Sequence, residues 1–124
     1  MKKVIFTKEA PAAIGPYSQA IEVNGMIYTS GQLPIDNETG LIPEDVEKQT
    51  EQSLKNVFAI LKESGAETSN VIKTTVFIKD MNDFPRINKV YETFFSDNFP
   101  ARSCVEVARL PKDVLVEIEV VAFK

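Results

Sequence analysis

The chain has 124 residues and a formal net charge of −4, from 14 basic and 18 acidic side chains with no histidine. This length fits a single domain, residues 1–124, and the shares of 44% hydrophobic and 26% charged residues are typical of a globular protein. The lack of histidine excludes Ser-His-Asp triads, Cys-His dyads and imidazole metal sites. One cysteine, Cys104, excludes an intrachain disulfide and a thiolate metal cluster.

The charge and hydropathy patterns also limit the partners and the location. A mildly acidic chain without a basic stripe disfavours nucleic-acid binding. The N-terminal residues lack the apolar run of a signal peptide, and the longest apolar stretch, residues 57–61, is too short to span a bilayer. We therefore expect a cytoplasmic protein without a membrane segment.

Three short strands are expected in the first quarter of the chain, at residues 4–7, 20–23 and 26–30. The second and third are separated by Asn24-Gly25, which is the strongest short signal for a hairpin because both residues tolerate a positive φ. The segment from Pro34 to Pro43 carries dense turn chemistry and is expected to be one surface loop.

Two helices and three more strands follow. Residues 46–64 have an apolar stripe at helical spacing, with acidic residues at the start and Gly65 as the stop. Residues 71–78 are rich in β-branched side chains and indicate a central strand. A second helix is expected near Asp83, a plausible N-cap, with Pro85 in its first turn. The chain ends with strands at residues 102–109 and 114–123.

The resulting order, β-β-β-α-β-α-β-β, predicts an α+β fold: a mixed six-stranded sheet with two helices on one face. The last strand has one unbroken apolar face for these helices. Its opposite face is apolar at both ends and carries two carboxylates, formed by Leu115, Glu117, Glu119, Val121 and Phe123. A face exposed to water is usually more polar, so we expect it to pack against another subunit of a homo-oligomer.

Three segments carry candidate functional residues: Gly15-Pro16-Tyr17-Ser18-Gln19-Ala20, Thr29-Ser30-Gly31-Gln32-Leu33-Pro34, and the run from Phe99 to Pro111. The first two could equally be a turn and a plain strand terminus. In the third, Arg102 stands where a loop becomes a strand and could grip a carboxylate through two parallel hydrogen bonds. A structural ion pair with an acidic neighbour is the alternative.

The role of two further residues also stays open at this point. Cys104 is better explained as a small strand filler than as a nucleophile, because no histidine is present to activate it. Glu117 lies on the face assigned to an interface, where a carboxylate needs a partner. That partner could be Arg102 or Arg109, or it could be a water molecule that Glu117 orients for catalysis.

Parts of these segments resemble the signatures of the Rid/YjgF family of reactive-intermediate deaminases. The matching stretches are Gly15 to Ala20, Ser30-Gly31-Gln32, Pro100 to Val107, and Leu110-Pro111-Lys112-Asp113 through Val116-Glu117-Ile118-Glu119. The resemblance covers the whole chain, and Arg102 matches the arginine of the archetypal deaminase branch. It implies a chorismate-mutase-like fold and a homotrimer with an inner barrel and active sites between subunits. The implied activity is hydrolysis of 2-imino acids, such as 2-iminobutanoate and 2-iminopropanoate, to 2-oxo acids and ammonia.

The resemblance also implies the roles of individual residues. Arg102 would clamp the substrate carboxylate, and Glu117 would hold the attacking water or relay its proton. The pocket would be formed by Tyr17, Ser30, Gly31, Cys104 and, less directly, Asn88. No metal or cofactor is implied, because an imine is already electrophilic and positioning supplies much of the catalysis.

Two alternatives remain. The first is a non-enzymatic trimer that binds small carboxylates such as 2-oxo acids in its clefts between subunits, which would use the same arginine. The second is an RNA-acting or chaperone-like protein, since members of this family have been associated with translation inhibition and ribonuclease activity. The net charge and the lack of histidine argue against nucleolytic chemistry.

Overall fold

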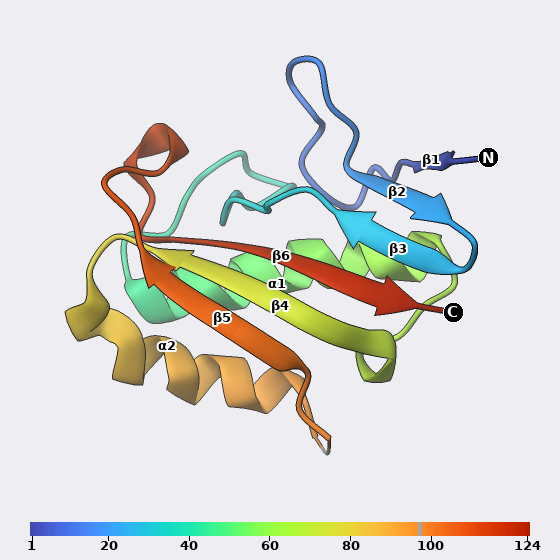
Figure 1. Cartoon of the computed structure of the whole chain (residues 1–124). Helices are drawn as coiled ribbons and strands as arrows, with labels where there is room; N and C mark the ends of the chain where they lie inside the picture. The colour runs from blue at the N-terminus through green and yellow to red at the C-terminus, as the bar shows by residue number, and fades with distance from the viewer. Residues whose placement is uncertain (97) are drawn as a thin grey trace.

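The last strand of the chain lies in the middle of the sheet. In this computed structural model, which describes residues 1–96 and 98–124, β6 (Val116–Phe123) pairs antiparallel with both β3 (Met26–Thr29) and β4 (Val71–Ile78). The six strands follow the order β1-β2-β3-β6-β4-β5, and only β4 and β5 (Ala101–Glu106) run parallel. At the other edge, β1 (Lys3–Ile5) pairs antiparallel with β2 (Ala20–Val23). Figure 1 shows this mixed sheet as one twisted layer.

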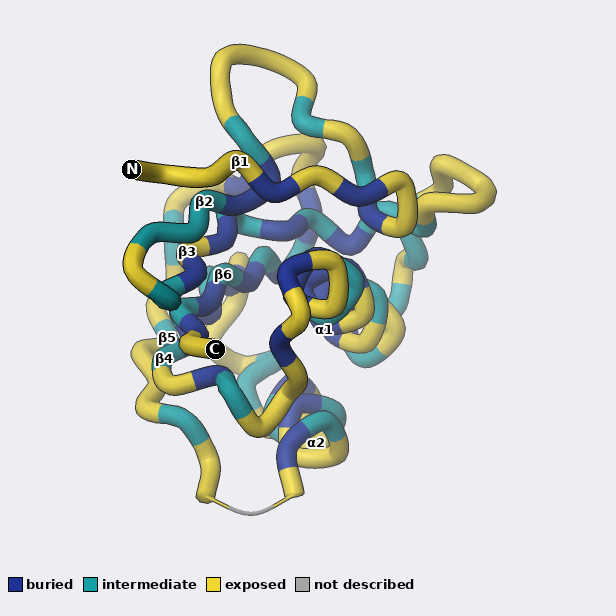
Figure 2. The backbone as a smooth tube through the Cα atoms, turned by 90° about the vertical axis from the view of Figure 1, so that its right-hand side faces the viewer, coloured by how far each residue is buried: buried dark blue, intermediate teal, exposed yellow. Residues whose placement is uncertain are grey.

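Both helices, α1 (Val46–Glu63) and α2 (Phe84–Tyr91), cover the same face of the sheet. Residues alternate between the two faces of a strand, so every second residue of β6 contacts the helices. Figure 2 shows the resulting core between sheet and helices. In β6 this face consists of Val116, Ile118, Val120 and Ala122, each at most 2% exposed. The predicted fold class and the predicted helix-facing side of the last strand are confirmed.

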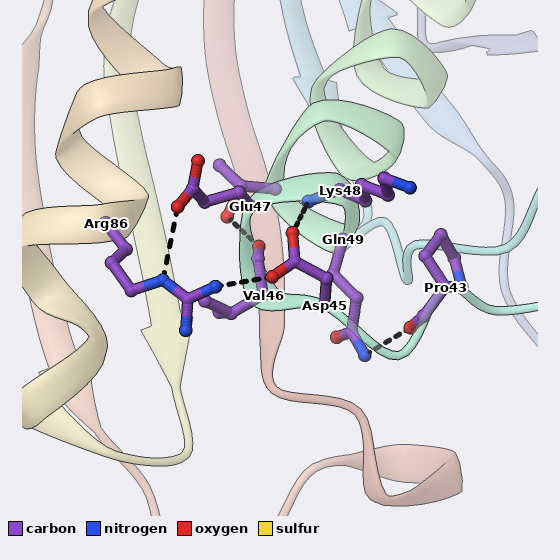
Figure 3. Close-up of polar contacts among 8 residues, drawn as sticks. Pro43, Asp45, Val46, Glu47, Lys48, Gln49 and Arg86 are labelled. Atoms are coloured by element: carbon purple, nitrogen blue, oxygen red, sulfur yellow. Dashed lines mark hydrogen bonds and ion pairs between the residues drawn. The ribbon is translucent and has the colours of Figure 1, made fainter.

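The start of α1 is held by polar contacts that Figure 3 draws. Asp45 caps the helix by accepting a hydrogen bond from the Lys48 amide at 3.1 Å. Arg86 of α2 reaches both Asp45 and Glu47, donating to the Glu47 carboxylate over 3.2 Å. These contacts tie the first turn of α1 to α2, and the helix ends before Gly65, whose φ of +86° fits a C-terminal glycine.

Several predicted boundaries were wrong by a few residues, each for a local reason. The first strand ends at Ile5 because the Thr7 amide donates to the Gln19 side chain. The strand predicted at 102–109 ends at Glu106, since its parallel neighbour β4 ends at Ile78. The strand predicted from residue 114 begins at Val116, after a 3₁₀ turn at Pro111–Asp113.

The expected N-cap of the second helix occupies the predicted position without the predicted hydrogen bond. Asp83 is the last residue of a 3₁₀ turn, Met81–Asp83, and its side chain caps nothing. Asp80 accepts a hydrogen bond from the Asn82 amide at 2.9 Å instead, so the acidic cap stands one turn earlier. The predicted hairpin is confirmed: Asn24 and Gly25 have φ values of +51° and +76° between β2 and β3.

The face of the sheet away from the helices has no covering layer in the single chain. Tyr28 of β3 and Phe123 of β6 lie on this open face and are 47% and 44% exposed. None of the helices in the described part of the chain combines the length and apolar character needed to cross a membrane.

Leu54 provides a test of the core. Its side chain on α1 is fully buried, so Leu54→Ala should lower the free energy of unfolding by about 2–5 kcal/mol in urea titrations. Leu41→Ala is the matched control, because Leu41 is 69% exposed and its loss should change stability by less than about 0.5 kcal/mol. Equal losses for the two variants would contradict this assignment of the core.

Candidate functional site

A cavity of about 510 Å³ opens where the N-terminal loop, the segment after β3 and the start of β6 meet. Its polar part contains four of the residues selected from the sequence: Tyr17, Ser30, Gly31 and Glu117. The remaining wall is mainly apolar and includes Pro11, Ala12, Ile14, Leu33, Ile35 and Pro111. The structure therefore brings together four of the seven candidate site residues from segments up to about a hundred positions apart in sequence.

Glu117 is the acidic group of this cavity. It lies on the open face of β6, opposite Phe77 of β4, and its carboxylate is half-buried. Burial raises the pKa of the Glu117 carboxyl above its ordinary value, and the neighbouring charge of Glu119 adds to this effect. No arginine or lysine among the described residues forms an ion pair with it. The alternative in which Glu117 pairs with Arg102 or Arg109 is therefore not formed within one chain.

Gly31 is required for space. A Cβ atom at this position would lie 2.9 Å from Cδ of Glu117 and closer still to Oε2, so any side chain here would displace the carboxylate. Glycine at residue 31 therefore lets the main chain after β3 approach Glu117 in its present position. Within the described residues, the Gly31 amide makes no hydrogen bond, which leaves a donor beside Glu117 for a ligand.

The loop that carries Tyr17 is held by the side chain of Gln19. This amide, only 3% exposed, accepts from the Thr7 amide at 2.8 Å and donates to the carbonyls of Thr7 and Pro11 at 3.1 and 2.9 Å. Ser30 joins the loop to the end of β3, because its hydroxyl donates to the Ser18 carbonyl over 2.6 Å. The Tyr17 ring, 53% exposed, thus stands on a loop whose base is fixed.

The segment after Gly31 is held from the opposite side by α1. Ser53 donates to the Gln32 carbonyl over 2.7 Å, and the Asn56 amide donates to the carbonyls of Leu33 and Ile35, each at 3.0 Å. Gln32 also exchanges two backbone hydrogen bonds with Ile118 of β6. The helix and the central strand together position the main chain that faces Glu117.

Arg102 lies on the opposite side of the sheet, at the start of the edge strand β5. Its partner in the parallel ladder is Thr74, which pairs in turn with Val120 of the helix-facing side. The guanidinium lies over the rings of Phe84 and Tyr91, 5.2 and 4.8 Å from their centroids. Figure 1 shows β5 and α2 side by side at this edge.

The guanidinium is oriented by a neutral partner. Nη1 of Arg102 donates to Oδ1 of Asn88 over 2.6 Å, and no carboxylate among the described residues pairs with it. The expected alternative, an ion pair with an acidic neighbour, is therefore wrong. Arg102 and Asn88 line a separate hollow of about 370 Å³ with Tyr91 and Phe99. An exposed arginine held by stacking and an amide keeps its charge for a ligand.

Cys104 follows Arg102 on the same face and packs partly against the core. Burial raises the pKa of its thiol, while the charge of Arg102 opposes that shift. A raised thiol pKa disfavours the thiolate, which agrees with a small strand filler rather than a nucleophile.

The two halves of the site thus lie on opposite faces of one sheet. Alternation along the strands puts Arg102 and Cys104 on the helix side and Glu117 on the open side, so one chain does not bring Arg102 and Glu117 together. Sequence reasoning missed the residues that hold the site, Gln19, Ser53 and Asn56. For Ser53 and Asn56 the signal was present in the sequence, because they are polar positions on a buried face of α1.

Comparison with known proteins places this chain in a family. The family model described as Endoribonuclease L-PSP matches residues 7–124. A protein of Salmonella typhimurium named 2-iminobutanoate/2-iminopropanoate deaminase is 54% identical over 127 residues, covering 100% of this chain and 99% of that protein. A RutC family protein of Pyrococcus abyssi is 52% identical and covers 99% of this chain and 98% of its own length.

Solved structures of similar proteins support the same family assignment. The YjgF gene product of E. coli, 54% identical, superposes with a TM-score of 0.96 over 98% of both chains. E. coli TdcF, solved with bound serine, is 51% identical and superposes with a TM-score of 0.95, again over 98% of both. The chain belongs to the L-PSP endoribonuclease family of YjgF and Rid proteins. The predicted resemblance and the chorismate-mutase-like fold are confirmed.

The contacts of Asn56 predict a measurable cost. Asn56→Ala removes both donors to the Leu33 and Ile35 carbonyls at a position 1% exposed, so unfolding should become easier by about 1–3 kcal/mol. Hydrogen exchange of the Gln32 amide should accelerate in the same variant. Lys55→Ala, one position earlier and exposed, is the control and should leave both readouts nearly unchanged. Unchanged exchange at Gln32 in Asn56→Ala would contradict the positioning role.

Proposed function

We propose that this protein is a deaminase that hydrolyses 2-imino acids, including 2-iminobutanoate and 2-iminopropanoate, to 2-oxo acids and ammonia. The observation that carries the proposal is the Glu117 carboxylate: it is half-buried in a cavity, unpaired, and has a raised pKa. Such a group is suited to general-base catalysis. The named activity of relatives that are 54% identical over the whole chain supplies the substrate class.

The chemistry needs a water molecule, a base and a carboxylate clamp. With the imine protonated at nitrogen, water adds through its oxygen to the carbon of the C=N bond and Glu117 accepts one of its protons, which gives a neutral carbinolamine. Glu117 returns this proton to the amino nitrogen. The C–N bond then breaks as the hydroxyl oxygen forms the C=O bond, and the hydroxyl proton passes to the released ammonia, which leaves as ammonium. No electron is gained or lost. Fixing the water and the imine in attacking geometry supplies much of the acceleration.

The clamp would come from a second copy of the chain. Arg102 and Glu117 belong to different faces in one chain, while the open sheet face and the exposed edge of β5 are both available for contact. In a closed homotrimer, β5 of one subunit would bring Arg102 to the Glu117 cavity of the next. The open faces would then form the inner barrel, and exposed apolar residues such as Tyr28 and Phe123 would be covered.

The remaining residues would shape this shared pocket. Tyr17 would close it from its loop, Ser30 and Gly31 would line it, and the amides of Gly31 and Cys104 would bind polar atoms of the substrate. Asn88 would act through Arg102, because its side-chain oxygen already accepts a hydrogen bond from the guanidinium. The apolar wall around Leu33 and Ile35 would receive the aliphatic part of the imino acid.

A second candidate function is binding without turnover. The relative solved with bound serine supports it, because serine carries the same carboxylate next to a nitrogen-bearing carbon. A trimer that only bound small carboxylates such as 2-oxo acids would use the same arginine. Measured turnover therefore distinguishes the two functions, whereas ligand affinity does not.

Arg102→Ala should lower kcat/KM for 2-iminobutanoate by about 10²-fold or more, because the carboxylate loses its bidentate partner. The imine is generated in situ by a threonine dehydratase and trapped with semicarbazide, so active protein suppresses the semicarbazone signal. Arg102→Lys should restore little, since an ammonium cannot replace the planar fork.

The control for this variant is Arg86→Ala, which removes an arginine from α2 that lines neither hollow. Light scattering should give the trimer mass for the wild type and for both variants, three times the 13.8 kDa chain. Full activity in Arg102→Ala would refute the clamp. A monomeric wild type that still turns over the imine would refute the shared site.

The raised pKa of Glu117 predicts how the deaminase activity depends on pH. As base it must be ionised, so kcat/KM should fall as the pH is lowered through the raised Glu117 pKa, and this acidic limb should lie above the ordinary value of 4.5. Glu119→Gln removes the neighbouring negative charge and should move the limb to lower pH. Glu117→Gln should lower kcat by about 10² to 10⁴-fold at neutral pH. A limb unaffected by Glu119→Gln, or an active Glu117→Gln, would contradict this role.

A further inference from the structure

The turn immediately before β6 has an unusual backbone. Lys112 and Asp113 follow each other with φ values of +57° and +55°, in the left-handed region that residues other than glycine rarely occupy. Such conformations cost free energy and persist only where the surrounding structure maintains them. The turn and the loop between β1 and β2 both stand out from the upper side of the molecule in Figure 1.

The neighbours of Lys112 maintain this turn without using its side chain. Arg109 donates hydrogen bonds from Nε and Nη2 to the two carboxylate oxygens of Asp113, at 2.8 and 3.3 Å. The Asp113 amide donates to the carbonyl of buried Leu110 at 3.0 Å. The Lys112 side chain makes no hydrogen bond or ion pair with the described residues. Asparagine would suit the left-handed backbone better than lysine, so the turn itself gives no reason for an amine at this position.

The cavity around Glu117 offers a reason for an amine at position 112. Lys112 lines the 510 Å³ cavity that contains Glu117, and it also lines an adjoining hollow of about 310 Å³ with Ile14 and Ile35. Among the described residues that line the main cavity, Lys112 is the basic residue and Glu117 the acidic one. The other walls are neutral. A negatively charged substrate that enters this cavity therefore meets one attractive charge in the wall and one repulsive charge.

We propose that Lys112 is a specificity-determining residue whose ammonium group attracts the carboxylate of the incoming 2-imino acid. The inference rests on the proposed function, since it concerns the same site and substrate class. Lys112 acts on binding and on the rate of encounter, because a flexible ammonium offers a point charge rather than a fixed fork. It selects anionic imines over neutral ones of equal size.

Lys112→Asn tests this directly, because asparagine keeps the left-handed backbone and removes the charge. The matched control is Lys2→Asn, which removes the same charge from an exposed position outside both hollows. Lys112→Arg keeps the charge. In the semicarbazide assay we expect Lys112→Asn to raise KM for 2-iminobutanoate about five- to tenfold with kcat within twofold of the wild type. Increasing ionic strength should lower kcat/KM of the wild type and Lys112→Arg more than that of Lys112→Asn.

A second readout does not depend on turnover. Calorimetric titration with 2-oxobutanoate should show weaker affinity for Lys112→Asn than for the wild type, Lys112→Arg or Lys2→Asn, whereas the neutral 2-oxobutanamide should bind Lys112→Asn and wild type equally. Equal affinity of all four proteins for 2-oxobutanoate would overturn the proposal. So would a fall in kcat with unchanged KM, or a lower melting temperature that Lys112→Arg shares. A wild type that binds 2-oxobutanoate without hydrolysing imines would refute the proposed function and leave the titration to decide the role of Lys112.

Discussion

The alternation of side chains along β6 is the constraint on which the rest of this structure depends. One set of its residues, from Val116 to Ala122, is almost fully buried under the two helices. The other set includes Glu117 and Glu119 and lies on the open face. Because β6 pairs with both β3 and β4, its register sets the side on which every neighbouring residue stands. A shift by one residue would bury two carboxylates in the core.

The cavity around Glu117 is built from main chain that the core holds in place. Segments without regular structure form most of its wall, and such segments are normally mobile. Here Gln19 holds the N-terminal loop, while Ser53 and Asn56 hold the segment after β3 from inside the helix layer. Buried side-chain amides and hydroxyls satisfy carbonyl groups that no strand pairs. The result is a fixed, close approach of Gly31 to the carboxylate, so a side chain at that position would displace Glu117.

The two faces of the sheet carry complementary chemistry. The helix side offers a guanidinium stacked on two rings, and the open side offers a half-buried carboxylate with a raised pKa. In a deaminase that acts on an imino acid, the first group suits the carboxylate of the substrate and the second suits the water. Their separation on one chain means that the two groups form no ion pair within a single subunit. Assembly with further copies would then create the complete site.

The sequence by itself determined the element order, the two helices, the faces of the last strand and four of the residues that line the Glu117 cavity. These follow from local physics: helical and strand periodicities, glycine and asparagine at positive φ, and the apolar stripe of α1 that includes Leu54. Only the tertiary structure decided that Arg102 and Glu117 lie on opposite faces, since this depends on how β5 and β6 each register with β4. It also decided the contacts of Asn56 and the placement of Lys112 in the cavity wall, because both join segments distant in sequence.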